Sequence, residues 1–565
     1  MLSIRKIGVI GRTYRHLNRY RQILTVFFKY GFGDLVDLLK IDQYIEIGLQ
    51  MISRHRRERL ERMTRAERVR LAMEELGPTY VKLGQVLSTR PDLIPVDFIH
   101  ELAKLQDEVP PFPFEDVHRI ITRELGDAPD AIFKHFDETP QASASIGQVH
   151  RAVLKDGDQV AVKVQRPGIR KTIEVDLEIM LHLATLMEHH IEEIAFYRPI
   201  KIVEEFAKTL ERELDYTFES SHMERMAGHL LSDMTVYVPK VYRELTTPKV
   251  LTAEFIDGIK ISETKQLEDA GLDRREITQR GAHILLRQVF EIGFFHGDPH
   301  PGNIFVLPEN VICLLDFGMV GSVDRQTRED FVELVDAVVH RHEARTAQVL
   351  LKLTTWDEKP DIRSFEKDVA DFMGRHLYRP LEEINFGRLL QHLLELASQN
   401  RLIIPPDIFL MMKTLAAVEG VARMLDPTFD IFATAAPFVK QVKIARFHPD
   451  RLTDDFLRLS TELLEFLQQF PTELLDITRQ MRQQKFALPV ELKGLTAMLE
   501  THDQSSNRVS FAIIIAGLII GSSIIVVANI PPLFYGISLI GIIVFITGAV
   551  MGLWLLVAII KKGRL

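Results

Sequence analysis

The sequence predicts an α+β fold with two lobes, in which a small strand-rich lobe precedes a helical lobe and an apolar helix pair ends the chain. Three observations predict this order. Residues 132–165 alternate apolar and polar side chains around an Asp-Gly turn at 156–157, which is the pattern of a β-hairpin. Residues 325–500 show almost entirely helical periodicity. Residues 509–560 contain no Asp, Glu, Lys or Arg.

The N-terminal extension, residues 1–76, begins as a basic amphipathic segment. No acidic residue precedes Asp34, and apolar side chains are interleaved with these cations: Arg5, Lys6, Arg12, Arg15, Arg19, Arg21 and Lys29. Such a helix can lie on anionic lipid or pack on the body as a solvated helix, and the sequence leaves both interpretations open. Because no aromatic and basic stacking platform follows, nucleic-acid binding is not expected.

The middle of the chain mixes helices with short strands. Gly and Pro breaks separate the expected helices, at about 35–75, 78–88, 115–125, 172–230 and 275–293, and residues 110–113 form a linker. Further strands are expected at 250–255, 304–307 and 311–315. The single cysteine, Cys313, lies in the last strand, where we interpret it as a small core residue. A single cysteine excludes an intrachain disulfide.

The uncharged C-terminal segment divides at an Asn-Ile-Pro-Pro turn into residues 509–528 and 533–560. Each run has the length of about 20 residues that a membrane-spanning helix needs, so we expect a transmembrane hairpin rather than a buried core helix pair. Cations flank it on both sides: Arg508, Lys561, Lys562 and Arg564. The positive-inside rule therefore places the body of the chain and both termini in the cytoplasm, at the cytoplasmic membrane. Glycines along both runs allow close helix packing and permit a homodimer.

The richest group of chemical side chains is His-Gly-Asp-Pro-His-Pro-Gly-Asn at 296–303, followed by Asp-Phe-Gly at 316–318. Phosphoryl transfer needs a carboxylate beside the attacking hydroxyl and oxygen ligands for Mg²⁺. Asp298, Asn303 and Asp316 supply these groups, because the intervening strands bring Asp316 back beside Asn303. A zinc site is not expected, since a His-x₃-His pair needs a helix that the prolines and glycines prevent. A serine hydrolase is not expected either, since no Gly-x-Ser-x-Gly elbow is present.

Upstream, the sequence Val-Ala-Val-Lys places Lys163 on a strand after a turn. A lysine at such a position can hold the α- and β-phosphates of a nucleotide. An isolated strand lysine would be an ordinary solvated cation, but here it precedes Asp298, Asn303 and Asp316 in the order that a phosphate site requires.

These residues resemble the protein-kinase-like fold, and three further motifs resemble the UbiB (AarF-like) family of atypical kinases of ubiquinone biosynthesis. Lys-Leu-Gly-Gln at 82–85 resembles the KxGQ motif of that family, Glu-Leu-Asp at 213–215 resembles its ExD motif, and Ala-Ser-Ala-Ser at 142–145 resembles its alanine-rich nucleotide loop. The resemblance runs from about residue 77 to residue 320. The C-terminal helix pair is also similar to that of bacterial members.

The resemblance implies a role for each residue of the phosphate site. Lys163 would contact the phosphates of ATP or ADP, with Glu219 as its ion-pair partner. Asp298 would occupy the catalytic-base position, and Asn303 and Asp316 would hold Mg²⁺.

Further roles are implied for the surrounding motifs. Nucleotide contacts would come from the loop and the hinge: Ala142, Ser143, Ala144, Ser145, Glu254 and Ile256. Lys82 and Gln85 share one helix face, and that helix would cover the place of a protein substrate, with Lys82 taking part in catalysis. Glu213 and Asp215 would receive this helix and help to coordinate the metal.

The sequence also departs from protein kinases. Its nucleotide loop has Ala and Ser in place of the usual glycines, which restricts the backbone, and Ser143 stands where the family usually has alanine. The segment after residue 318 is short and lacks Ala-Pro-Glu. Phosphorylation of other proteins is therefore not expected.

The resemblance divides the chain into a helical extension, a KxGQ segment over the active site, an N-lobe with the ExD helices, a C-lobe core, a helical region and a transmembrane hairpin. We expect these at residues 1–76, 77–126, 127–258, 259–345, 346–508 and 509–560. It implies a membrane-anchored, Mg-ATP-binding kinase or ATPase that supports ubiquinone (prenylquinone) biosynthesis, by handling lipid intermediates or the biosynthetic enzymes. Implied partners are membrane lipids, quinone precursors and those enzymes. The alternatives are a small-molecule kinase of the aminoglycoside or choline kinase type and a non-catalytic nucleotide-binding scaffold.

Overall fold

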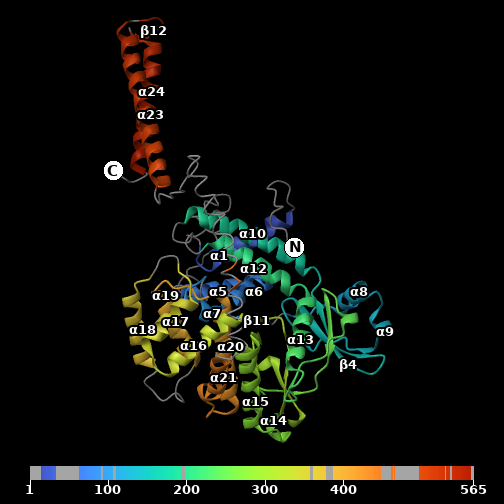
Figure 1. Ribbon diagram of the computed structural model, residues 1–565. Coiled ribbons are helices and arrows are strands. Elements are labelled where there is room, and N and C mark those ends of the chain that lie inside the picture. The colour runs from blue at the N-terminus through green and yellow to red at the C-terminus, as the bar shows by residue number, and fades with distance from the viewer. Residues whose placement is uncertain are drawn as a thin grey trace. The chain divides into compact units, whose positions relative to one another are not determined.

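The structure is a computed structural model of the whole chain. It describes residues 14–32, 63–88, 90, 93–105, 110–191, 198–356, 360–376, 386–446, 460, 461, 464, 495–528, 530–534 and 537–561. The chain forms two compact units, Met1–Leu452 and Thr453–Leu565, which are coloured by residue number in Figure 1. The predicted helix at 35–75 lies within the described residues only from residue 63 onward.

The strand-rich lobe is built on one antiparallel sheet of the order β1-β3-β4-β6, with β2 paired to β3. Its strands are β1 (Phe133–Phe136), β2 (Ala142–Ser143), β3 (Gly147–Leu154), β4 (Gln159–Gln165) and β6 (Val250–Glu254). Val160, Val162 and Val164 alternate along β4 toward a cluster that includes Val117 and Ile121 of α8 (Phe114–Leu125). The predicted hairpin is confirmed, and the period of two turns the side chain of Lys163 to the opposite face.

The second lobe carries a smaller sheet of the order β5-β10-β9-β7, and β8 pairs with β11. The bounds are β5 (Val236–Tyr237), β7 (Ile259–Lys260), β8 (Phe294–His296), β9 (Ile304–Leu307), β10 (Val311–Leu314) and β11 (Val320–Ser322). The two strands predicted here, β9 and β10, are confirmed. Cys313 on β10 is fully buried, and burial raises the pKa of its thiol to about 12, as expected for a core residue.

Helices complete this lobe, and all but the first of them share one hydrophobic core. They are α14 (Thr264–Asp269), α15 (Arg274–Arg287), α16 (Arg325–Val339), α17 (Glu343–Leu353), α18 (Ile362–His376), α19 (Phe386–Gln399), α20 (Pro406–Leu425) and α21 (Ile431–Ala445). A π-helical turn, Gln288–Ile292, follows α15 and ends at Gly293, whose φ of 74° suits a glycine. The helical prediction for 325–500 is thus confirmed for the described residues through α21, and most of residues 447–494 lie outside the described part.

The remaining α-helices among the described residues of the first unit are α1 (Tyr14–Lys29), α5 (Arg65–Leu76), α6 (Pro78–Leu87), α7 (Val96–Leu102), α9 (Pro129–Ile132), α10 (Ile169–His190), α12 (Pro199–Glu213) and α13 (Tyr216–Leu230). Ile23, Leu24 and Val26 of α1 are at most 3% exposed. Arg19 of α1 also bonds Asp176 of α10 at 2.6 Å. Over its described length α1 therefore packs on the body, which was one of the two interpretations; residues 1–13 lie outside the described part.

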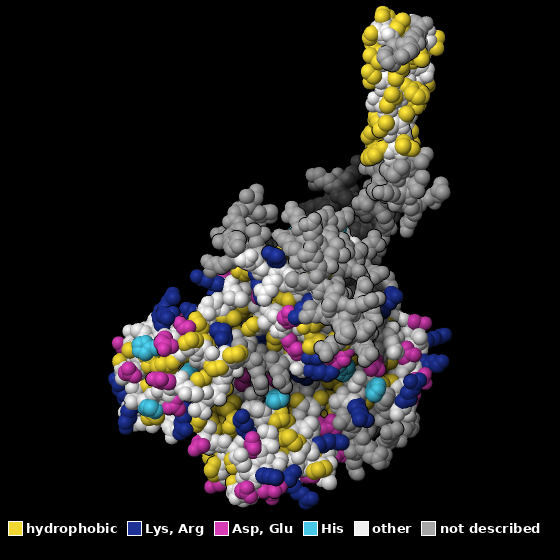
Figure 2. Space-filling model, turned by 180° about the vertical axis from the view of Figure 1, so that it is seen from behind, with side chains coloured by type: hydrophobic (Ala, Val, Ile, Leu, Met, Phe, Trp, Pro, Cys, Tyr) yellow, Lys and Arg dark blue, Asp and Glu magenta, His cyan; other side chains and the backbone are white. Residues whose placement is uncertain are grey.

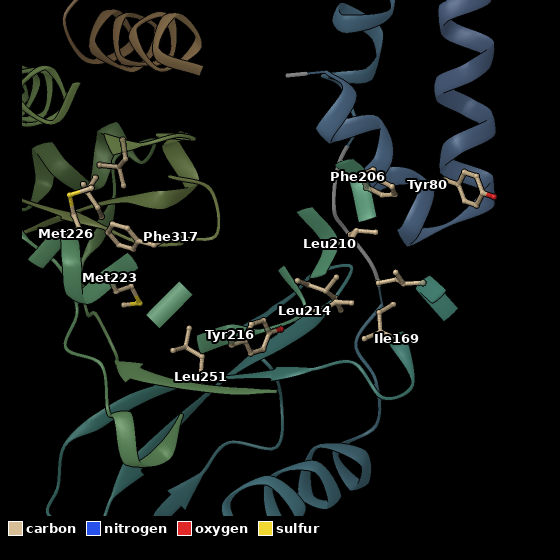
Figure 3. Packing of buried hydrophobic residues seen from close by; sticks show 14 of the residues in the cluster. Tyr80, Ile169, Phe206, Leu210, Leu214, Tyr216, Met223, Met226, Leu251 and Phe317 are labelled. Carbon is tan, nitrogen blue, oxygen red and sulfur yellow. The ribbon is translucent and has the colours of Figure 1, made fainter. Parts of the chain in front are cut away.

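A continuous core joins the helix of the KxGQ motif to the strand lobe and to the Asp-Phe-Gly segment (Figure 3). The labelled members come from α6, α10, α12, α13, β6 and the loops beside them: Tyr80, Ile169, Phe206, Leu210, Leu214, Tyr216, Met223, Met226, Leu251 and Phe317. Because these side chains pack together, the covering helix and the candidate phosphate site have fixed relative positions.

The second unit contains two consecutive helices, α23 (Leu495–Val527) and α24 (Leu539–Lys561), joined by the short strands β12 (Leu533–Phe534) and β13 (Ile537–Ser538). They are antiparallel, since Gly541 lies against Val526 and Gly552 lies against Ile515. A Cβ added at Gly517 or Gly521 would meet nothing within 4 Å, so these two glycines do not contribute to this contact. The boundary between units lies at residue 452, and α23 begins at Leu495, upstream of the apolar run.

Part of this helix pair has the character of a membrane span. Val509–Val527 is long and apolar enough to cross a membrane, whereas the apolar part described in α24, Leu539–Leu555, is shorter. Figure 2 shows the surface of the pair covered by hydrophobic side chains. They include Ile513, Ile524 and Trp554, each more than 60% exposed.

Candidate functional site

Lys163 and Glu219 form an ion pair between the strand lobe and α13. The ammonium nitrogen of Lys163 lies 2.8 and 3.0 Å from the two carboxylate oxygens of Glu219, and the two side chains are 21% and 10% exposed. The ring of Tyr216 lies beside the same ammonium, 5.2 Å away. Burial opposes the charged form of Lys163, but the carboxylates of Glu219 and Asp316 outweigh it and raise the pKa of Lys163.

Residues 297–303, between β8 and β9, form the candidate catalytic loop, which is held by the buried side chain of His296 on β8. One ring nitrogen, Nε2, faces the carbonyl of Leu315 at 3.0 Å, and the other, Nδ1, accepts from the backbone N–H of Asp298 at 3.3 Å. Since Nε2 must donate to a carbonyl, this arrangement fixes the tautomer. The ring also packs edge-on against Phe317, with 5.2 Å between centroids. His296 is therefore a structural support between the two motifs, with both nitrogens engaged.

Asn303 and Asp316 are brought together by the β9–β10 hairpin. The backbone N–H of Leu315 donates to the carbonyl of Asn303 at 2.8 Å, and the side-chain amide of Asn303 donates to the carbonyl of Asp298 at 3.4 Å. Asp316 has a φ of 56°, a left-handed conformation that Asp tolerates better than most residues. The Asp298, Asn303 and Asp316 positions thus converge on one place, as the sequence predicted.

The environment of Asp316 keeps its carboxylate ionised. The Lys163 ammonium lowers the pKa of Asp316 against the effect of burial, and the N–H of Gly318, 3.1 Å away, acts in the same direction. An ionised carboxylate beside an amide oxygen is a donor set that Mg²⁺ accepts. These residues fit a magnesium ion bound to nucleotide phosphates.

The KxGQ helix reaches this site through Lys82. Its ammonium lies 3.3 Å from Oε2 and 3.5 Å from Oε1 of Glu213, at the end of α12. Gly84 allows the close packing of α6, because a Cβ there would collide with Leu105 and approach Met73 Sδ to 2.9 Å.

The other residues of the two motifs have local partners. Gln85 donates to the carbonyl of Leu105 at 3.3 Å. Asp215 is the N-cap of α13 and accepts from the N–H and the hydroxyl of Thr217, at 3.0 and 2.6 Å. The structure therefore pairs Lys82 of the first motif with Glu213 of the second. Gln85 and Asp215 do not pair across the two motifs; each has a partner close to it in sequence or in the fold, Leu105 and Thr217.

The alanine-rich loop contains two unusual hydroxyls. The side-chain oxygens of Ser143 and Ser145 are buried, and neither has a hydrogen-bond partner among the described residues. The loop itself is closed by a bond from the N–H of Ala144 to the carbonyl of Gly147 at 2.8 Å. Gly147 is required here, since a Cβ would lie 2.6 Å from the carbonyl oxygen of Val164 and would overlap the Tyr216 hydroxyl.

The hinge follows β6. The carboxylate of Glu254 accepts from the hydroxyl of Tyr237 at 2.6 Å and from the N–H of Lys240 at 3.2 Å, so this side chain secures the hinge. The backbone N–H groups of Glu254 and Phe255 donate to carbonyls of Lys240 and Gln159.

At the next residue, Ile256, the backbone N–H has no partner among the described residues. It is the hinge donor that remains available to a ligand.

Three family models match the chain. The ABC1 atypical kinase-like domain matches residues 104–350, the UbiB helical domain matches 369–430, and the ABC1/UbiB kinase-like C-terminal domain matches 493–561. A probable protein kinase UbiB from Cellvibrio japonicus is 36% identical over 74% of this chain and 77% of its own length. The chain belongs to the UbiB family. The α+β, protein-kinase-like fold class predicted from the sequence is confirmed.

Other relatives cover more of the chain. A probable protein kinase UbiB from Marinobacter nauticus is 34% identical over 80% of this chain and 83% of its own. A Clostridium pasteurianum protein, described as uncharacterized and located in the 5′ region of hydrogenase 1, is 31% identical over 97% of this chain and 99% of its own. A solved complex of Rv3197 with erythromycin from Mycobacterium tuberculosis matches with a TM-score of 0.46 and 26% identity, over 62% of this chain and 90% of that chain.

Two residues near the site were not predicted from the sequence. His222 of α13 lies with Nδ1 3.0 Å from the carbonyl of Phe317, so it ties this helix to the Asp-Phe-Gly segment. Lys413 of α20, in the UbiB helical domain, lies with Nζ 3.5 Å from Oδ1 of Asp298. Neither belongs to a motif, and the sequence separation of 115 between Lys413 and Asp298 leaves no local signal for their contact.

Proposed function

We propose that this UbiB-family chain is a membrane-anchored, Mg-ATP-binding atypical kinase or ATPase that supports ubiquinone (prenylquinone) biosynthesis. The observation that carries the proposal is the Lys163–Glu219 ion pair beside Asp316, whose pKa Lys163 lowers. This is the arrangement of cation and carboxylates that positions nucleotide phosphates and their metal in kinases.

In this proposal each side chain has a separate task. Lys163 neutralises phosphate charge and is itself held by Glu219. Asp316 and Asn303 hold Mg²⁺, which supplies charge neutralisation on the phosphates. Asp298 accepts the proton of the attacking hydroxyl or water. The N–H of Ile256 meets adenine, and the Ser143 and Ser145 hydroxyls lie on the loop that faces the phosphates.

The covering helix supports an acceptor that is not a protein. Lys82 on α6 pairs with Glu213, and α6 is anchored in the same core as Phe317. A peptide would have to displace this packed helix. The proposed role is ATP-driven handling of lipid intermediates or assembly of the enzymes that modify them, with membrane lipids and quinone precursors as partners.

The deciding experiment measures phosphate release from Mg-ATP by the full chain, with and without anionic liposomes, for the wild type and Asp316→Asn. Asn tolerates the left-handed backbone of Asp316, so the variant removes charge without strain. Asp324→Asn is the matched control, because Asp324 only caps α16 through Thr327 at 2.9 Å and Asn caps equally well.

We expect release that depends on lipid and is lost in Asp316→Asn but not in Asp324→Asn. Nucleotide binding without any turnover would instead identify a scaffold. Transfer of phosphate to a soluble small alcohol would identify a small-molecule kinase.

The membrane part of the proposal is that α23 and α24 both cross the bilayer, with the body and both termini in the cytoplasm. Close packing at Gly541 and Gly548 supports a pair that enters and leaves together. Deleting residues 509–565 should leave the melting temperature of the body unchanged and weaken its membrane partitioning. Unchanged partitioning would refute the anchor.

The topology can be tested by thiol labelling. The native Cys313 is buried, so cysteines introduced at Ser506 and Asn529 can be labelled separately with an impermeant reagent in sealed vesicles. We expect labelling from opposite sides of the membrane; labelling from the same side would contradict the hairpin.

A further inference from the structure

One face of α20 lies across the catalytic loop. Thr414 places its hydroxyl 3.5 Å from the carbonyl of His296, and Leu410 lies 3.2 Å from the position of a Cβ at Gly297. Lys413 places Nζ 3.5 Å from Oδ1 of Asp298. Positions 410, 413 and 414 share one helix face. This helix therefore presents a packed side chain, a cation and a hydroxyl to three consecutive residues, from the end of β8 into the loop that follows it.

Lys413 differs in setting from its neighbours on α20. Thr414 and Met411 are fully buried, whereas the side chains of Lys413 and Asp298 are 34% and 46% exposed. Exposed ion pairs of this kind contribute little to stability. A contribution to folding stability therefore does not explain why Lys413 lies beside the candidate catalytic carboxylate.

The helix that carries Lys413 is fixed from two sides. Its inner face belongs to the core of the helical lobe, which also includes Val96 at the start of α7. Near its first turn, Asp407 lies within electrostatic reach of Arg90, which follows the KxGQ helix. Contacts to both the covering segment and the catalytic loop fix the position of α20, so the ammonium of Lys413 has a defined position.

We propose that Lys413 is a positioning residue for phosphoryl transfer, through which the UbiB helical domain orients the Asp298 carboxylate. This inference rests on the proposed function. An acceptor hydroxyl bonded to Asp298 would lie about 3 Å from the carboxylate, and Nζ of Lys413 is 3.5 Å from the same group. If the acceptor hydroxyl bonds that same oxygen, Oδ1, the cation is at most about 6.5 Å from the acceptor oxygen.

The step can be written with its atoms balanced. The acceptor oxygen forms a bond to the γ-phosphorus while its proton passes to Asp298. The bond from the γ-phosphorus to the bridging oxygen breaks, and its electron pair leaves with ADP. Lys413 keeps the carboxylate turned toward the acceptor before the transfer.

The test uses the full chain in anionic liposomes with Mg-ATP and measures phosphate release. Lys413→Met should lower kcat by about 10- to 100-fold, the range expected for a misplaced catalytic group, and leave the KM for ATP within about twofold. Lys413→Arg should restore most of the rate. The matched control is Lys443→Met, because Lys443 forms a similar helix-borne ion pair with Asp336 at 2.8 Å and, among the described residues, has no hydrogen bond or ion pair with the site.

A second set of variants separates positioning from folding. Adding Lys413→Met to Asp298→Asn should cause no further loss of kcat, since Lys413 acts through that carboxylate. Equal loss in Lys443→Met, or a further loss in the double variant, would overturn the inference. A wild-type rate or a raised rate in Lys413→Met would also overturn it. If the wild-type chain shows no turnover at all, the proposed function fails and the inference falls with it; if only Lys413→Met equals the wild type, the inference alone fails.

Discussion

Glu219→Gln tests whether the ion pair on α13 prepares the protein for nucleotide. The substitution keeps the shape of the side chain and removes its charge. Lys163 would lose one of its two charge-assisted bonds, now 2.8 and 3.0 Å long, and would turn toward Asp316, whose carboxylate also acts on it.

The expected magnitude is that of the charge-assisted hydrogen bond which the substitution removes. A hydrogen bond between charged groups contributes about 1.5–3 kcal/mol, and neither partner is more than 21% exposed, so solvent screening is limited. If the bond between Lys163 and Glu219 contributes this free energy to nucleotide binding, its loss lowers nucleotide affinity by about 10- to 150-fold.

The assay is a titration of the full chain with Mg-ADP, followed by calorimetry or by a fluorescent analogue. Glu224→Gln is the control on the same helix, because Glu224 pairs with the exposed Arg243, and exposed pairs contribute little. An affinity of Glu219→Gln within twofold of the wild type would refute the reasoning, as would an equal loss in Glu224→Gln.

Three further predictions concern stability and coupling. Gly147→Ala should lower stability by about 1–3 kcal/mol through overpacking and so lower the melting temperature, while Gly374→Ala, in open space, should not. Burial lowers the pKa of His150, so the unfolded chain takes up its proton first and this part of the stability is lost as pH falls below about 6.5. The melting temperature of His150→Gln should therefore drop less than that of the wild type between about pH 7.5 and about pH 5.5, on either side of the ordinary histidine pKa. An equal drop in the two proteins would contradict this. Lys82→Met and Glu213→Gln should be coupled by about 1 kcal/mol in a double-mutant cycle of the phosphate-release rate, whereas additive effects would show that their 3.3 Å contact has no role.

The sequence revealed the elements whose signal is local. The alternation of β3 and β4 around a turn, and the Gly-Pro break before α6, each require only neighbouring residues. Strands such as β5 and β7 are two residues long, too short to show a period. The amphipathic pattern of α1 could not say whether protein or lipid covers its apolar face, because both remove it from water.

The site shows the same division. Asp298, Asn303 and Asp316 converge because the β9–β10 hairpin lies between Asn303 and Asp316. The spacing of the motifs in the sequence was therefore enough to predict this convergence. The N-cap role of Asp215 also had a local signal, since Thr217 follows two residues later, whereas the motif resemblance implied metal coordination by Asp215. The contact of Lys413 with Asp298 depends on how one helix packs over a loop, which no pattern in one sequence records.

The central claim is that Lys163, Asn303 and Asp316 bind nucleotide together with magnesium. The most direct test is the calorimetric affinity of the full chain for ATP with and without Mg²⁺, in the wild type and in Asp316→Asn. The account predicts that Mg²⁺ tightens binding to the wild type and that Asp316→Asn removes this dependence. Equal affinity with and without Mg²⁺ in the wild type, or an unchanged dependence in Asp316→Asn, would contradict it.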